Sequence, residues 1–469
     1  MKPIVRTIIA LLAVLSLGLT AQQGESFRFP ASVQGRRAEA YFNAFNSGAE
    51  AAMASFLKEN FSATALKRAP LEERLARFRD FKREAQGLAP ERLLRESGET
   101  TGYLVRSGKG ELLQFTFRFE SGANARIASI MADHVDPENV EDLAGPPLSR
   151  DEALARIRAV MEERAHADLF SGVVLVAQGD AVVLHEARGL ASKEYGAANR
   201  LDTRFNLGSI NKVFTRVAIG QLIEKGRVSL GDRISRFLPD YPNREAAAKV
   251  SVRHLLDMSS GIGDFFGNRY AQTPKGRIRS LEDYLPLFAD EPLLFQPGSQ
   301  RRYSNGGYIV LGLIVAKASG QDYFAYVREH IYAPAGLTAT EHLEADVPAE
   351  NVASGYTRLW DDGQHDKEPR RNNMYTRPAR GSSAGGGYAT AMDLFRFARA
   401  LRAGRLLGGL TTEWFGGSSA YAGGAPGINA ELQIDPIPGW TVVVMGNYDP
   451  PAASSLARKI AVLLRRMTE

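Results

Sequence analysis

Hydrophobic and polar positions along the chain form two sets of regular elements, separated by the segment from Leu143 to Ser149. That segment, LAGPPLS, places two prolines after a glycine, a combination that stops regular structure and indicates a linker. We therefore predict one domain over residues 22–145, a linker over residues 146–150 and a second domain over residues 151–469. Both segments have ordinary domain sizes.

The first set predicts a small α+β domain. Apolar residues recur at spacings of three and four over Arg36–Asn60 and over Leu71–Gln86, which predicts two helices. Strand-like runs follow at Thr101–Arg106, Leu112–Phe119 and Arg126–Met131. Phenylalanines alternate with polar residues in the middle run, so one face of the predicted sheet is apolar.

One short segment of this domain, from Ala40 to Gly48 (AYFNAFNSG), resembles the opening helix of nuclear-transport-factor-2-like domains. The resemblance implies a role in packing, ligand binding or dimerisation. A homodimer formed through this domain is therefore a partner hypothesis, and we expect no catalytic residues here.

The second set predicts a larger α+β domain. Its first two strands are joined by the turn Gln178-Gly179-Asp180, and a helix stands at each end of the domain. The predicted strands are Ser171–Ala177, Ala181–His185, Asn429–Ile434 and Trp440–Gly446. The predicted flanking helices are Arg150–Ala165 and Ala452–Met467, and residues from about 213 to 410 form a mostly helical region.

The N-terminus has the pattern of a secretory signal peptide. Lys2 and Arg6 form a basic region, Ile8–Leu19 is a run of twelve mostly apolar residues, and Ala21 offers a small residue before a polar start. We predict a signal peptide over residues 1–21 and export to the periplasm or exterior of a bacterium. An uncleaved anchor is the alternative, but twelve residues fall short of the roughly 20 that span a bilayer. We expect no transmembrane anchor in the mature chain.

The composition excludes several kinds of partner and catalytic site. The chain of 469 residues is 44% hydrophobic and 24% charged, as in a folded globular protein. Its net charge of +5 comes from interspersed residues, so we expect no nucleic acid partner. The absence of cysteine excludes thiol catalysis, disulfides and cysteine-bound metals. The seven histidines are scattered, and we predict neither a metal site nor a cofactor.

One serine motif is excluded by the order of serine and histidine along the chain. Gly381–Gly385 (GSSAG) matches the G-x-S-x-G pattern of a nucleophile elbow. In the α/β-hydrolases that use this elbow, the histidine follows the serine along the chain. The last histidine is His365, so we exclude this interpretation.

A serine can instead be activated by a lysine three residues later, because the two then share one helix face. The S-x-x-K pattern occurs at Ser55–Lys58 and at Ser209–Lys212. Ser55 lies inside an amphipathic helix, where Lys58 is a solvated residue. Ser209 stands where a loop enters a helix, the position from which a nucleophile attacks. The alternative for this pair is a helix cap followed by a surface lysine.

The partner expected of such a pair is a tyrosine that exchanges protons with it. Y-x-N occurs at Tyr41, at Tyr241 and at Tyr303. The first lies in the other domain and the second in a loop turn. Tyr303-Ser304-Asn305 stands just before a predicted helix over Tyr308–Ala318, again at the entry of a helix.

These motifs resemble, in order, those of the serine β-lactamase and penicillin-binding-protein superfamily. The similarity is greatest to the branch of class C β-lactamases, D-aminopeptidases and family VIII esterases. The resembling segments are Phe205–Thr215 (FNLGSINKVFT), Arg253–Asp264 (RHLLDMSSGIGD), Pro297–Thr340, Gly386–Leu401 and Trp440–Tyr448. The resemblance covers residues 151–469.

The sequence departs from this family at its third motif, K-T-G or H-x-G. Tyr421 replaces the family's lysine or histidine, ahead of Gly423 and Gly424. Tyrosine keeps a hydroxyl donor but carries no charge at pH 7, so we expect weaker selection for carboxylate-bearing substrates. Arg301 or Arg380 could restore that charge. A packing aromatic in a degenerate site is the alternative for Tyr421.

The resemblance implies acyl transfer. Ser209 attacks a carbonyl carbon, while Lys212 and Tyr303 move its proton and later activate water. Asn305 orients the lysine or a substrate amide, and the N–H groups of Ser209 and Gly424 form the oxyanion hole. Tyr421, Gly423 and Gly424 are the other predicted substrate-binding residues, the glycines admitting substrate closely to the strand.

The implied fold is an antiparallel sheet flanked by helices, with the active site between the sheet and a helical lobe. The implied function is that of an exported serine hydrolase acting on an ester, a D-amino-acid peptide or amide, or a β-lactam. A non-catalytic binding protein with a degenerate third motif is the alternative.

Overall fold

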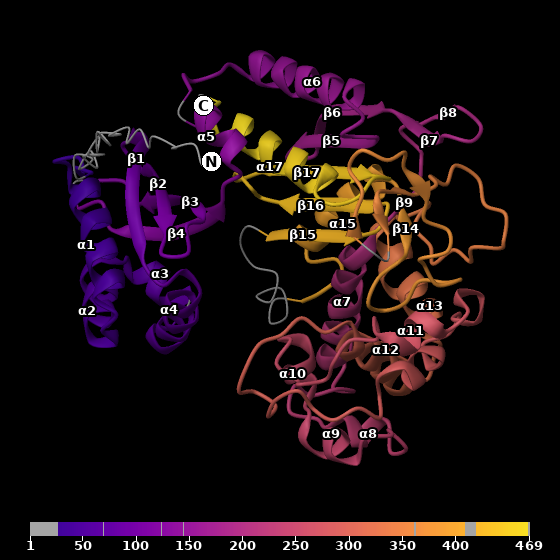
Figure 1. Ribbon diagram of the computed structural model, residues 1–469. Coiled ribbons are helices and arrows are strands. Elements are labelled where there is room, and N and C mark those ends of the chain that lie inside the picture. Colours follow the sequence, from indigo (N-terminus) through magenta and orange to yellow (C-terminus); the bar gives the residue numbers. More distant parts are fainter. Residues whose placement is uncertain are drawn as a thin grey trace, which may run out of the picture. The chain divides into compact units, whose positions relative to one another are not determined.

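The structure is a computed structural model that describes residues 27–68, 70–122, 124–143, 145–360, 363–408 and 419–467. The chain divides between Pro137 and Glu138 into two compact units (Figure 1). The predicted signal peptide, residues 1–21, lies outside the described residues.

The first unit is a four-stranded antiparallel sheet with helices packed on one face. The strands pair in the order β1-β2-β3-β4. Phe42 and Phe45 from the first helix pack with Phe115 and Phe117 of β3, which are fully buried. The elements are α1 (Val33–Ser47), α2 (Glu50–Asn60), α3 (Ala63–Arg68), α4 (Leu71–Ala85), β1 (Leu88–Ser97), β2 (Thr100–Ser107), β3 (Leu112–Phe119) and β4 (Ile127–His134).

The prediction of one helix over Arg36–Asn60 is wrong. Gly48, with φ 70°, ends α1 in the left-handed conformation, and its N–H donates to the carbonyl of Phe45. The chain then restarts as α2. Strand β1 was not predicted because it contains Pro90 and is largely exposed, so it lacks the apolar alternation of a half-buried strand.

The second unit is built on a five-stranded antiparallel sheet in the order β15-β16-β17-β5-β6. Its strands are β5 (Gly172–Gln178), β6 (Ala181–Arg188), β15 (Ser419–Ala425), β16 (Ile428–Ile434) and β17 (Trp440–Gly446). This confirms that the first hairpin and the last strands form one sheet. Strand β15 is an edge strand of that sheet, and one of its sides is therefore available to the site described below.

Alternate residues of the central strands enter two different cores. Val174 and Val442 pack with α6 (Arg150–His166) and α17 (Ala452–Arg465) on one face. Leu175 and Val443 pack on the other face with the helical lobe. Helices on both faces explain why β5 and β17 are nearly continuous apolar runs (Figure 1).

The helical lobe places α7 (Asn211–Glu224) against α12 (Asn305–Ser319), and both are buried along most of their length. Other α-helices among the described residues are α5 (Val140–Leu143), α8 (Ile234–Phe237), α9 (Arg244–Lys249), α10 (Val252–Leu256), α11 (Asn268–Gln272), α13 (Tyr323–Val327), α14 (Ala333–Ala335) and α15 (Ala391–Arg402). Short strands are β7 (Leu190–Ser192), β8 (Ala197–Ala198), β9 (Phe205–Asn206), β10 (Tyr356–Thr357), β11 (Leu359–Trp360), β12 (Gly363–Gln364), β13 (Arg371–Asn372) and β14 (Tyr388–Ala389).

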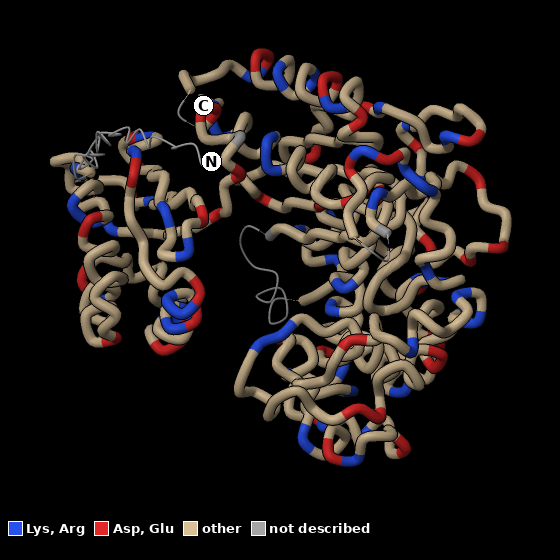
Figure 2. The backbone as a smooth tube through the Cα atoms, in the orientation of Figure 1, with Lys and Arg blue, Asp and Glu red and all other residues tan. Residues whose placement is uncertain are grey.

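The second unit begins at Glu138, ahead of the predicted linker over residues 146–150. Asp142 pairs with Arg466 at 3.2 Å, and the N–H of Leu148 donates to the carbonyl of Arg466 at 2.9 Å. Among the described residues, no helix is long and apolar enough to cross a membrane. Acidic and basic residues are intermingled along both units (Figure 2).

Candidate active site

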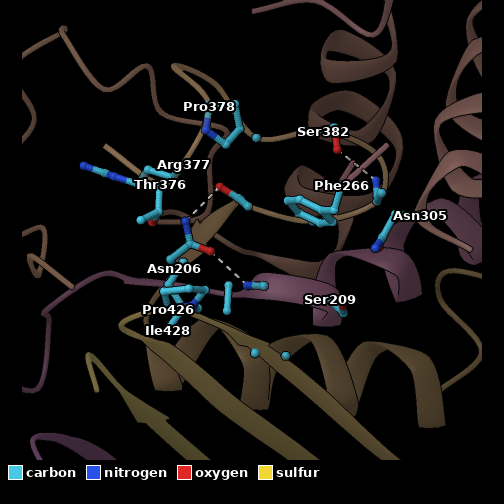
Figure 3. A pocket seen from close by; sticks show the side chains of 18 of the residues that line it. Asn206, Ser209, Phe266, Asn305, Thr376, Arg377, Pro378, Ser382, Pro426 and Ile428 are labelled. Atoms are coloured by element: carbon cyan, nitrogen blue, oxygen red, sulfur yellow. Dashed lines mark hydrogen bonds between the residues drawn. The ribbon is translucent and has the colours of Figure 1, made fainter. Parts of the chain in front are cut away.

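A tight turn presents Ser209 at the start of α7. Strand β9 pairs with β14, and a 3-10 turn over Gly208–Ile210 then leads into the helix. Gly208 has φ 49°, and a Cβ there would lie 2.8 Å from the backbone nitrogen of Gly424. The Asn206 Oδ1 accepts the N–H of Gly208 at 2.9 Å, and its Nδ2 donates to Gly386 at 3.3 Å (Figure 3). These contacts fix the turn.

Lys212 lies one helical turn after Ser209 and reaches its hydroxyl. The Nζ atom is 3.1 Å from Ser209 Oγ and 2.6 Å from Asn305 Oδ1, and it also donates to the carbonyl of Ala384. The side chain is only 6% exposed. The Lys212 amine is thus enclosed by oxygen acceptors in the core.

Burial changes the proton affinity of this amine. Removal from water lowers the pKa of Lys212 to about 7, and the Asp264 carboxylate opposes part of that shift. Asp264 stands behind Asn305, whose Nδ2 donates to it at 2.7 Å. Near pH 7 the amine therefore exists in both forms, and its neutral form can accept a proton.

Tyr303 completes the cluster from the entry of α12. Its hydroxyl donates to Ser209 Oγ at 2.6 Å. Ser304 caps the helix, accepting the N–H of Gly307 at 2.8 Å and donating to the Gly263 carbonyl at 2.9 Å. Burial raises the pKa of Tyr303, so the phenol keeps its proton at neutral pH. The structure thus brings Ser209, Lys212, Tyr303 and Asn305 together, from segments about a hundred residues apart.

The two predicted glycines lie on β15 beside this cluster. A Cβ at Gly423 would lie 1.9 Å from the carbonyl oxygen of Leu207, and one at Gly424 would lie 2.7 Å from Pro450 Cγ. Both residues line the cavity in front of Ser209. Their small size therefore serves the close approach of β15 to the protein's own chain, Gly423 against the Ser209 turn and Gly424 against Pro450.

The variant Gly423→Ala is expected to lower the free energy of unfolding by about 2–3 kcal/mol, because its methyl group overlaps the Leu207 carbonyl. Gly276→Ala is the matched control, since no atom lies within 4 Å of a Cβ there. Urea unfolding of the two variants measures the difference. Equal stability of both would contradict the close approach of β15.

Tyr421 and the two arginines that could restore the charge of the third motif are absent from the described lining of the cavity. Tyr421 is half-buried, packs against the larger core and is not among the described residues that line the cavity. Arg301 is exposed on a loop, and Arg380 lies 3.7 Å from the Phe324 ring centre and donates to His342. Arg377 lines the cavity instead, and it donates to the Tyr388 hydroxyl. No motif in the sequence marks Arg377.

The excluded G-x-S-x-G segment proves to be the loop that holds α7 in place. The Ser382 carbonyl accepts from Asn211 Nδ2 at 3.0 Å, and the Ser383 carbonyl accepts from Thr215 at 2.7 Å. The next carbonyl, that of Ala384, takes the bond from Lys212. Sequence reasoning missed this role because it rests on backbone carbonyls.

These groups open on a cavity of about 700 Å³. Its walls are rich in aromatic rings, and among the described lining residues Arg377 is the only charged one. The aromatic lining residues are Phe265, Phe266, Tyr270, Tyr284, Tyr303 and Tyr388. Within the described parts of the chain, no group of three or more histidine or carboxylate side chains is placed to hold a metal.

Comparisons with known proteins agree on one family. A family model described as Beta-lactamase matches residues 156–466. Penicillin-binding protein 4* of Bacillus subtilis (strain 168) is 31% identical over 205 residues, which are 43% of this chain and 45% of that protein. Esterase EstB of Burkholderia gladioli is 31% identical over 205 residues, 41% of this chain and 52% of EstB. The chain thus spans about half the length of these relatives.

A solved structure shows the same fold. The crystal structure of a penicillin-binding protein from Bacillus halodurans is 27% identical, with a TM-score of 0.58. The match covers 66% of this chain and 98% of that one.

Proposed function

The chain belongs to the beta-lactamase family of serine hydrolases, and from that premise we propose that it forms an acyl-enzyme on Ser209. The substrate is an ester, an amide or a peptide. The observation that carries the proposal is the meeting of two proton-transfer groups at one hydroxyl: Lys212 Nζ at 3.1 Å and the Tyr303 hydroxyl at 2.6 Å from Ser209 Oγ.

The proposed first step is attack by Ser209 Oγ on the carbonyl carbon. The neutral amine of Lys212 takes the hydroxyl proton, which becomes possible near pH 7 because burial has lowered its pKa. Oxygen–carbon bond formation then produces a tetrahedral oxyanion. The N–H groups of Ser209 and Gly424 stand on the two segments that line this end of the cavity, and we propose them as its donors.

The proposed second step releases the leaving group. Tyr303 donates its proton to the departing nitrogen or oxygen and regains one from Lys212, whose amine contacts Ser209 Oγ as the phenol does. Water then attacks the acyl carbon while Lys212 and Tyr303 take one of its protons. The bond between the acyl carbon and Ser209 Oγ breaks as that proton passes to Oγ, and the carboxylic acid is released. Asn305 keeps the amine in place throughout, through its 2.6 Å contact with Nζ.

We also propose export to the periplasm or exterior of a bacterium, on the basic and apolar pattern of residues 1–21. Dimerisation through the first unit stays a prediction.

A fluorophosphonate probe and a substrate panel test the proposed function. The panel holds short p-nitrophenyl esters, a chromogenic cephalosporin and D-amino-acid amides. We expect labelling and turnover of at least one class. The absence of both labelling and turnover would refute the proposal. Labelling without turnover of any class would favour the non-catalytic binding protein, for which the tyrosine at position 421 is the supporting observation.

The pH dependence of kcat/KM is expected to follow Lys212. Since the pKa of this amine is about 7, activity should rise from pH 5 to pH 9 with a midpoint near 7, as the amine loses its proton. Asp264 raises that pKa, so Asp264→Asn should move the midpoint to lower pH. A profile measured on one ester with both proteins checks this. A midpoint near 10 would show that the amine is not desolvated.

A further inference from the structure

An aromatic ring stands open to the cavity on a rigid base. Phe265 and Tyr284 are buried, at 4% and 1% exposure, with ring centres 4.8 Å apart. Phe266 packs on Phe265 at 4.4 Å and on Tyr270 at 5.0 Å, yet is 56% exposed. Figure 3 shows its ring reaching into the cavity beside Asn305. Such an apolar surface gains stabilisation when a ligand covers it.

One carboxylate fixes this ring relative to the catalytic cluster. Asp264 Oδ1 accepts the N–H of Phe266 at 3.0 Å, while Oδ2 accepts from Asn305 Nδ2 at 2.7 Å. Asn305 in turn holds Lys212 at 2.6 Å. The Phe266 backbone is therefore connected, through the side chains of Asp264 and Asn305, to the Lys212 amine that contacts Ser209 Oγ. A loosely held surface aromatic would not have this connection.

The charge of the cavity decides which ligand the ring suits. The face of a phenylalanine binds either a second aromatic ring or an ammonium cation. No described lining residue is acidic, and the Asp264 carboxylate, which accepts from Phe266 and Asn305, is not among the lining residues. Arg377 is the one charged side chain among the described lining residues, and no ion pair joins it to a described carboxylate. A cation would be repelled, so a neutral ring is the favoured partner.

Granted the proposed function, we infer that the substrate is an ester or amide carrying an uncharged aromatic group, and that Phe266 is the residue that selects it. The group packs on the open face of Phe266 while its carbonyl lies at Ser209. This narrows the substrate from any ester or amide to the aromatic ones.

The experiment uses esters that carry no aromatic reporter group. Their hydrolysis at pH 8 is measured from the acid that is released. Methyl phenylacetate and benzyl acetate place a ring on the acyl and the alcohol side, methyl acetate has none, and acetylcholine carries a cation. We expect kcat/KM for at least one aromatic ester to exceed that for methyl acetate about tenfold or more. Phe266→Ala should remove that ratio, and Phe266→Tyr should keep it.

The matched control is Tyr195→Ala, which truncates an aromatic side chain that is 89% exposed and lies outside the cavity lining. It should leave every ratio unchanged. The inference is overturned if the aromatic preference is missing, if it survives Phe266→Ala, or if acetylcholine is preferred to benzyl acetate. In those cases the proposed function still holds if methyl acetate is hydrolysed and this hydrolysis is lost in Ser209→Ala. Absence of both turnover and fluorophosphonate labelling refutes the proposed function itself.

Discussion

The variant Ser209→Ala is expected to lose fluorophosphonate labelling and to lower ester turnover by on the order of 10⁴-fold or more. Among the described residues, this hydroxyl is the one acceptor that both Lys212 and Tyr303 contact, so without it neither group has a proton to move. Ser209 is partly exposed, and among the described residues its hydroxyl bonds only with the Lys212 and Tyr303 side chains, so the fold should be retained. Labelling followed by mass spectrometry, with kcat/KM on one ester, measures both effects.

The chain supplies a matched control for this variant. Ser55 carries the other S-x-x-K pattern, on the exposed side of α2, and Ser55→Ala should leave labelling and turnover unchanged. Labelling that persists in Ser209→Ala at another serine would contradict the assignment of the nucleophile. Buried Ser382, in the loop that holds α7, would be the first alternative to examine.

The sequence predicts the cluster because its motifs are local. In S-x-x-K the helical period alone brings the amine to the hydroxyl, and Y-x-N precedes a helix whose start is visible in the pattern. The convergence of residues 209 and 303 is not local, and only the resemblance to a family implied it. The sheet was predictable for a similar reason, since β5 and β17 are apolar runs long enough to identify alone.

What could not be predicted depends on backbone atoms and on tertiary approach. The carbonyl of Ala384 is an acceptor for Lys212, but any residue type offers a carbonyl. Position 423 requires glycine because the Leu207 carbonyl lies where a Cβ would be, and these two residues are more than two hundred positions apart in the sequence. Arg377 enters the cavity from an irregular loop with no periodicity. Sequence patterns identify reactive residues at fixed spacings along the chain, whereas these contacts form only when distant segments pack together.

The variant Lys212→Arg is expected to lower kcat/KM by about 10²- to 10⁴-fold. A guanidinium keeps its proton at every pH that proteins tolerate, so it cannot take the proton of Ser209. The positive charge near the hydroxyl would be preserved, which separates the role of a base from that of a charge. The rise of activity through pH 7 should also disappear, because no titrating amine remains.

Since Lys212 is 6% exposed, the larger guanidinium could disturb packing, and Lys212→Met provides a second test of similar length. Both variants should show the same loss if the amine acts as the base, and circular dichroism checks that each is folded. Lys58→Arg, on the exposed side of α2, is the control. If Lys212→Arg is folded and has wild-type turnover, Lys212 is not the base. Tyr303 would then be the base, since its phenol is the other group that contacts Ser209 Oγ. Because burial raises the pKa of the Tyr303 phenol, activity would then increase only at alkaline pH, well above the midpoint expected for Lys212, and this profile distinguishes the two assignments.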